Sequence, residues 1–145
     1  MRTPKALLAG MVLTVLFAAG HFAGFLAARD AARSDPGLLD LTKAMQAHTT
    51  RVMGMEPSML DFREYFSANF SLLLLAAAGL TWVGAGLARK TPDPVSGFRT
   101  LAAVNITAFV LLAATSGIFR VPQGIVSSVV IIAAYAAALR PTGAR

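Results

Sequence analysis

The sequence contains no cysteine, and only 14% of its 145 residues carry a charge. Without cysteine the chain forms no disulfide, has no thiol chemistry and offers no thiolate to zinc or an iron–sulfur cluster. Soluble domains are normally about 25% charged, so the composition points away from water. The sequence also lacks the G-x-S-x-G, Walker and dinucleotide-binding motifs. It therefore offers no standard motif for an active site, a metal or a cofactor.

Acidic residues are also few. Thirteen Lys and Arg residues stand against seven Asp and Glu, which gives a formal net charge of +6. The basic residues lie between long apolar runs and form neither a stripe nor a basic tail. Their distribution excludes a nucleic-acid partner and leaves the lipid bilayer as the expected one.

Four apolar runs are long enough to cross about 30 Å of hydrocarbon, which takes about 20 helical residues. They cover residues 6–28, 67–88, 101–119 and 121–139, and none contains Lys, Arg, Asp or Glu. Segments in lipid must be helical because no water satisfies their backbone groups. The sequence thus predicts an all-α fold, a four-helix transmembrane bundle formed by one integral membrane domain over residues 1–145.

The first run follows Arg2 and Lys5, as a signal peptide would, and residues 25–28 resemble a small-residue cleavage site. Its apolar stretch is longer than the usual h-region of about 7–15 residues. We therefore interpret this run as an uncleaved anchor.

The charges between the runs predict the orientation. With a cytoplasmic amino terminus, the outer side has six basic and six acidic residues. The inner side has one acid, Asp93, and seven basic residues: Arg2, Lys5, Arg89, Lys90, Arg99, Arg140 and Arg145. We expect both termini in the cytoplasm and the protein in a bacterial inner (plasma) membrane.

The outer segment, residues 29–66, is long for a plain connection and is expected to be structured. Asp35 followed by Pro36 is a helix start signal, and Gly54 is a plausible stop. Between them an apolar stripe recurs at steps of three and four residues: Leu38, Leu41, Met45, His48, Val52 and Met55. This pattern predicts an additional outer amphipathic helix. Ser58 and Asp61 resemble a capping box that opens the second membrane run.

The candidate site residues gather at the outer ends of the runs. His21 is a candidate because an ionisable side chain inside a membrane span is energetically costly and is kept there for a reason. Gly20 and Gly24 lie beside it, and their spacing lets a neighbouring helix approach closely. We predict one polar pocket at the outer mouth, formed by His21, Asp61 and Arg120 with His48 packed over them and Tyr65 nearby.

Each of these residues also has a structural explanation. His21 and His48 can be packing residues, Asp61 can cap its helix, Tyr65 can mark the interface, and Arg120 can extend to the headgroups. Two histidines and a carboxylate could bind a divalent metal, or two histidines a haem, but no ligand spacing supports either. We expect no metal and no cofactor. Asn105, Thr107, Ser127 and Ser128 are expected to be interhelical hydrogen-bond partners.

Several short motifs give the chain a family resemblance. They are Gly20-His21-x-x-Gly24, Met53-Gly54, Ser58-Met59-Leu60-Asp61-Phe62 leading into Tyr65-Phe66, and Phe119-Arg120-Val121-Pro122. Together they resemble an uncharacterised family of small bacterial membrane proteins with four spans. The chain departs from that pattern at Arg63, where a second aromatic residue is expected. The resemblance implies the four-span architecture and brings no activity, substrate or cofactor.

Three classes of function fit these observations. The first is a non-enzymatic integral membrane protein that binds a small or lipidic ligand, or a partner subunit, at its outer mouth. The second is an intramembrane enzyme acting on lipid or isoprenoid groups, with His21 as base. The third is an assembly subunit or homo-oligomer that packs through its glycines. We expect the first.

Overall fold

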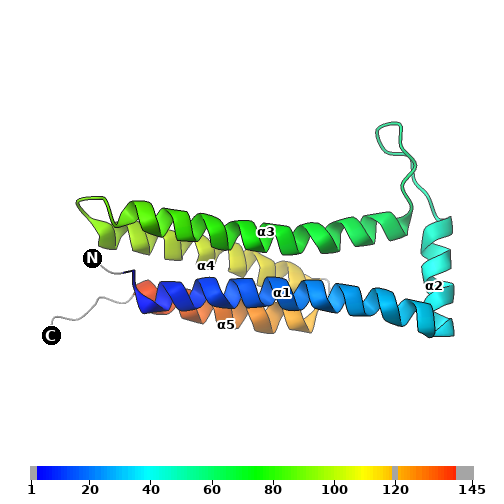
Figure 1. Cartoon of the computed structure of the whole chain (residues 1–145), viewed down its shortest axis with the longest axis horizontal. Coiled ribbons are helices and arrows are strands. Elements are labelled where there is room, and N and C mark those ends of the chain that lie inside the picture. Colours follow the sequence, from blue (N-terminus) through cyan, green and yellow to red (C-terminus); the bar gives the residue numbers. More distant parts are fainter. Residues whose placement is uncertain (1–2, 119–120, 140–145) are drawn as a thin grey trace. The chain divides into compact units, whose positions relative to one another are not determined.

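The computed structural model describes residues 3–118 and 121–139, and the regular structure in this part of the chain is helical. The five helices are α1 (Lys5–Ser34), α2 (Pro36–Ala47), α3 (Met59–Ala88), α4 (Pro94–Ile118) and α5 (Pro122–Leu139) (Figure 1). The predicted all-α class is confirmed.

Three of the helices, α1, α3 and α4, are long and apolar enough to cross a membrane. The apolar stretch of α5, Gly124–Leu139, is shorter over its described residues. Helices α1 and α3 have 30 residues each. At 1.5 Å per residue each is about 45 Å long, which exceeds the hydrocarbon thickness of about 30 Å. Both helices thus extend beyond the apolar runs 6–28 and 67–88 into the outer segment. The helix lengths are those of a membrane protein.

The chain divides into two compact units. The four-segment unit comprises Met1–Phe17 and Leu75–Arg145, so it holds the first half of α1, the second half of α3, and all of α4 and α5. The hairpin unit is Ala18–Leu74 and holds the rest of α1 and α3, with α2 and the segment that follows it.

The core of the four-segment unit consists of one stripe on each helix, with the steps of three and four residues that close helix packing requires. On α4 the stripe is Phe98, Ala102, Asn105 and Phe109; on α5 it is Gly124, Ser128, Ile131 and Tyr135. Small and polar residues such as Ala102 and Ser128 are buried beside large ones such as Tyr135. Many large apolar residues, among them Leu80, Trp82 and Val104, are exposed. This distribution is typical of helices packed in lipid, where small and polar residues lie between helices.

Polar contacts connect the helices of this core. The Asn105 Nδ2 group donates to Thr81 Oγ1 at 2.9 Å and so joins α4 to α3. The hydroxyls of Thr14 on α1 and Tyr135 on α5 lie 3.5 Å apart. The expected interhelical role is confirmed for Asn105, whereas Thr107 donates to the Ala103 carbonyl of its own helix. The buried Ser128 hydroxyl has no hydrogen-bond partner among the described residues.

Gly10 and Gly97 are two of the glycines that make close packing possible in this unit. A Cβ at Gly10 would stand 2.7–2.8 Å from three ring carbons of Tyr135. A Cβ at Gly97 would stand 2.7 Å from the Ala88 Cβ. Both distances are too short for real carbon atoms, so α1 meets the Tyr135 ring, and α4 meets α3, only because these residues have no side chain.

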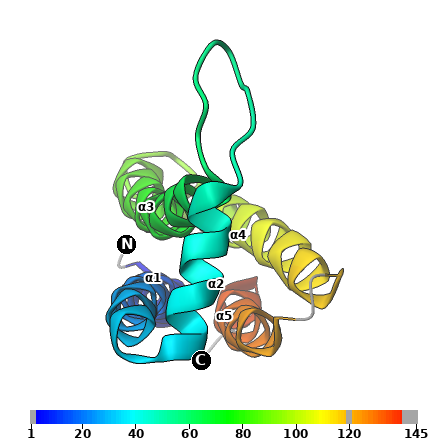
Figure 2. The ribbon, with the colours of Figure 1, turned by 90° about the vertical axis from the view of Figure 1, so that its right-hand side faces the viewer.

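In the hairpin unit, α2 begins as predicted and ends earlier than predicted. The Asp35 carboxylate accepts from the Gly37 and Leu38 amides at 2.8 and 3.3 Å, with Pro36 in the first turn. The helix stops at Ala47, with His48 as its extended C-cap. The predicted stripe that continued through His48, Val52 and Met55 on one helix is therefore wrong. Figures 1 and 2 show α2 running across the ends of the α1 and α3 segments of this unit.

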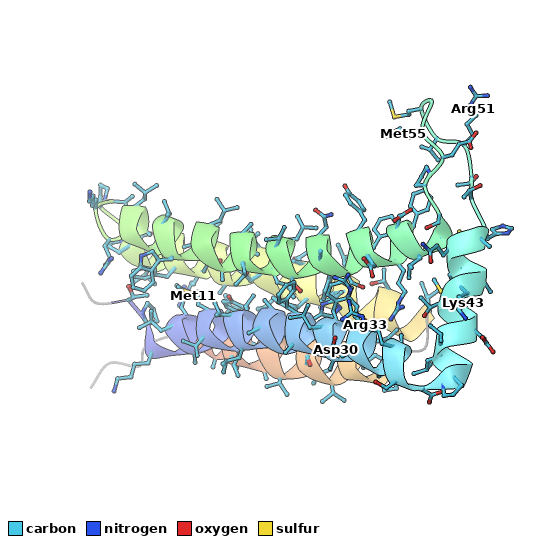
Figure 3. All side chains as sticks on the ribbon, turned by 45° about the vertical axis from the view of Figure 1, so that its right-hand side comes forward. Met11, Asp30, Arg33, Lys43, Arg51 and Met55 are labelled. Carbon is cyan, nitrogen blue, oxygen red and sulfur yellow. The ribbon has the colours of Figure 1, made fainter. Side chains whose placement is uncertain are left out.

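The residues after α2 form a short antiparallel hairpin. The amides and carbonyls of Val52 and Met55 are hydrogen-bonded to each other at 2.9 Å, and Thr49 pairs with Ser58. Met53 and Gly54 have φ values of 49° and 84°, the positive values that a two-residue type I′ turn requires. The hairpin extends to one side of α2 and carries Arg51 and Met55 far from Lys43 (Figure 3).

Successive side chains on a strand point to opposite faces, so this register divides the hairpin into two faces. Val52, Met55 and Pro57 share one face, and Arg51 and Glu56 share the other. Met53 at the tip is 95% exposed and Met55 is 67% exposed. The side chains of this segment thus alternate between the two faces of an extended hairpin, and do not follow the helical spacing of three and four residues that the sequence predicted.

Candidate functional site

The half-buried His21 pairs with a serine of α3 in the hairpin unit. Its Nδ1 atom lies 3.0 Å from the Oγ atom of Ser71, which is buried. The Phe70 ring meets the imidazole edge-on, with 4.7 Å between the ring centroids. Nδ1 either donates to or accepts from the serine hydroxyl, depending on the imidazole tautomer.

A second polar pair joins the same two helices further along. Arg29 Nε lies 3.2 Å from Glu64 Oε1, and the Arg29 guanidinium lies 5.8 Å from the centroid of the Phe25 ring. Arg29 is eight residues after His21, and Glu64 is seven before Ser71, so the two pairs are about 10–12 Å apart along the helices. We call these four residues, His21, Ser71, Arg29 and Glu64, the outer seam.

Asp61 serves as the capping residue that the sequence predicted. Its Oδ2 atom accepts from the Ser58 amide at 2.8 Å and from the Ser58 hydroxyl at 2.7 Å, while its own amide donates to Ser58 Oγ at 3.1 Å. These two bonds from Ser58, first the hydroxyl and then the amide, hold the pKa of the Asp61 carboxyl below its usual value. Asp61 is exposed and precedes the apolar run 67–88.

The structure does not bring Asp61 to His21. Asp61 lies ten residues before Ser71 on α3, which is about 15 Å along the helix axis. The residue opposite His21 is Ser71, and the acid that pairs across α1 and α3 is Glu64. The outer polar contacts therefore form a line along two helices.

The remaining predicted site residues lie elsewhere. His48 is exposed, its amide donates to the Ala44 carbonyl and its carbonyl accepts from the Met59 amide at the base of the hairpin. Tyr65 is exposed and its ring meets that of Phe66 at 5.5 Å between centroids. Arg120 lies outside the described residues. No three His, Asp or Glu side chains of the described ranges lie together as a metal site would require.

Gly20 and Gly24 do not have a close neighbour in the hairpin unit. A Cβ added at either position meets nothing within 4 Å in the described chain. The close helix approach expected there is found in the four-segment unit instead, at Gly10 and Gly97.

Sequence reasoning missed an apolar groove between α1 and α3 of the four-segment unit. Its volume is about 450 Å³. It is lined by Leu8, Met11, Val12, Val15 and Leu16 of α1 and by Leu75, Ala78, Gly79 and Trp82 of α3. None of these side chains is titratable, so the groove is suited to hydrocarbon. The lining residues look like ordinary membrane residues in the sequence, and only the spacing of the two helices distinguishes them.

Comparison with protein-family models, with curated proteins and with solved structures gives no significant match to the chain.

Proposed function

We propose that this chain is a non-enzymatic integral membrane protein that binds a lipidic ligand in the groove between α1 and α3. The observation that carries the proposal is the groove itself, about 450 Å³ in volume and lined by aliphatic side chains and Trp82. Gly79 leaves part of its wall open, since a Cβ there would meet nothing within 4 Å. An acyl chain fits such a wall through dispersion contacts and needs no polar partner.

The proposed setting is a four-helix transmembrane bundle in a bacterial inner membrane, with both termini in the cytoplasm. Its support is the buried stripe on each helix of the four-segment unit, including α5, which contains small and polar residues beside large ones, together with the many exposed large apolar side chains. The balance of six basic and six acidic residues in the outer loops, against seven and one on the inner side, supports the orientation.

The test is native mass spectrometry of the protein purified in mild detergent, comparing Gly79→Leu with Gly20→Leu. Both positions have free space around a new side chain, but only Gly79 lines the groove. We expect Gly79→Leu to fill the groove and lower lipid occupancy severalfold, while Gly20→Leu binds as the wild type does. Equal occupancy in both variants would overturn the proposal. A stoichiometric protein subunit in place of lipid would support the assembly class instead.

The intramembrane enzyme is a second candidate because of the Ser71–His21 contact. A serine hydroxyl at 3.0 Å from an imidazole nitrogen has the spacing of a nucleophile and its general base. Against it, Ser71 lies in the middle of α3, where backbone amides are engaged in helical hydrogen bonds and offer no oxyanion hole.

Labelling with a fluorophosphonate separates this candidate from the first. An enzyme of this kind reacts at Ser71, and both Ser71→Ala and His21→Ala abolish the labelling. We expect no labelling of the wild type. Labelling that depends on both residues would favour the enzyme.

A further inference from the structure

The groove ends in positive charge at one end of both of its walls. On α1, Lys5 stands three residues before Leu8 and seven before Val12, so it begins the same helical stripe that lines the groove. On α3, Gly79, Trp82 and Gly86 follow one another at steps of three and four residues, which places them on one face. Lys5 and Arg89 do not line the groove themselves, but helical spacing places each of them in line with a lining stripe, beyond its last lining residue.

The Arg89 side chain turns back along α3 toward the groove. Its Nη2 atom lies 3.8 Å from the position that a Cβ would occupy at Gly86. The guanidinium thus lies over the turn next to Trp82, on the lining face of the helix. Arg89 is seven residues beyond Trp82, about 10 Å along the axis, and the folded side chain shortens this distance.

No described acid neutralises these cations. The ion pairs of residues 3–118 and 121–139 are Arg29–Glu64 and Arg33–Asp30, both in the hairpin unit. The nearest acid along the chain, Asp93, accepts from the Ser96 amide at 3.1 Å and so caps the start of α4. Lys5 lies in the first turn of α1, where the helix dipole disfavours a cation.

We infer that the groove is a site for an anionic phospholipid, with an acyl chain along α1 and α3 and the phosphate between Lys5 and Arg89. This inference rests on the proposed function and specifies its ligand. The charge complementarity favours a lipid whose headgroup keeps a net negative charge, such as phosphatidylglycerol, over a zwitterionic one. With both termini in the cytoplasm, the lipid belongs to the cytoplasmic leaflet.

The experiment titrates delipidated protein with phosphatidylglycerol and, separately, with phosphatidylcholine of the same chain length, and counts bound lipids by native mass spectrometry. We expect a preference for phosphatidylglycerol of at least about tenfold, because two basic side chains attract its net negative charge and are repelled by the choline cation of phosphatidylcholine. The double variant Lys5→Gln/Arg89→Gln should bind both lipids equally. The matched pair Arg33→Gln/Lys43→Gln loses the same charge from the hairpin unit and should keep the preference.

The outcomes separate this inference from the proposed function. Equal binding of the two lipids by the wild type, or the same loss of preference in both double variants, would overturn the anionic site and leave the groove as a lipid site. Unchanged binding of both lipids by Gly79→Leu would overturn the groove itself. Arg89→Lys keeps the charge and should keep the preference; its loss in this variant would contradict the electrostatic account.

Discussion

Gly10 is the residue on which the packing of α1 against the Tyr135 ring most depends. We expect Gly10→Ala to lower the free energy of unfolding by about 1–3 kcal/mol, because the new methyl overlaps a buried aromatic ring that cannot move freely. Gly20→Ala is the control: its methyl meets nothing within 4 Å, and alanine favours a helix by up to about 1 kcal/mol. Melting temperatures in one detergent compare the two, and a Gly10→Ala variant as stable as Gly20→Ala would contradict the packing.

Ser58 and Asp61 make the start of α3 sensitive to acid. The hydrogen bonds from Ser58 lower the pKa of Asp61, so the carboxylate's contribution is complete above its unfolded pKa of about 3.9 and is lost as the pH falls through the lower folded pKa. We expect amide exchange in the first turn of α3 to accelerate in that acidic window. In Asp61→Asn the exchange rate should not change over this pH range. If the acceleration persists in that variant, another titrating group causes it.

Removing the Ser58 hydroxyl tests the same cap at neutral pH. Ser58→Ala should destabilise the first turn of α3 by about 1 kcal/mol, since the Asp61 amide then has no side-chain acceptor. Hydrogen exchange at residues 59–62 measures the change. Ser58→Thr keeps the hydroxyl and should exchange nearly as the wild type does.

At the scale of elements, the hairpin depends on the positive φ of its two turn residues. Gly54→Val should open the tip, because a β-branched residue at φ 84° is strongly disfavoured. Met53→Gly should preserve it, since glycine adopts φ 49° without strain. Limited proteolysis at residues 49–58 reports both variants. Equal cleavage of Gly54→Val and the wild type would show that the turn does not hold the hairpin.

The elements show how far the sequence could predict this fold. Long apolar runs, the Asp35–Pro36 start and the Ser58–Asp61 box are local signals, and the structure confirms the helices and caps that they predict. The end of α2 could not be predicted from periodicity because steps of three and four along His48, Val52 and Met55 suit a helix stripe. Met53 and Gly54 were the missed signal, since a glycine at the second position favours a tight hairpin turn.

The candidate site was harder to predict because it depends on the register of α1 against α3. His21 was singled out because an ionisable side chain inside a span is costly, but its neighbour Ser71 is 50 residues away and carries no distinctive motif. Arg29 and Glu64 are similarly ordinary charged residues in sequence. Expecting Asp61 beside His21 placed the two residues at one membrane depth, whereas the residue of α3 that meets His21 is Ser71, ten residues further along. Asp61 therefore lies about 15 Å along the helix from the contact between His21 and Ser71.

At the scale of the whole molecule, the proposed orientation can be tested without background labelling, because the chain has no cysteine. Met53→Cys places one thiol at the exposed hairpin tip, and Thr91→Cys places one in the exposed connection between α3 and α4. We expect a membrane-impermeant maleimide to label Met53→Cys in intact spheroplasts and Thr91→Cys only after permeabilisation. The reverse pattern would place the hairpin in the cytoplasm.

The exposed hairpin tip also has a chemical consequence. The thioethers of Met53 and Met55 are open to solvent, whereas Met11 is buried in the four-segment unit. Oxidation to the sulfoxide makes a flexible apolar side chain polar, so dilute hydrogen peroxide should convert the hairpin's apolar face into a polar one before it reaches the buried Met11. Peptide mass spectrometry should find Met53 and Met55 oxidised well ahead of Met11. Equal oxidation rates would contradict this order, and the predicted order would make the two hairpin methionines sites that react with an oxidant before the packed core does.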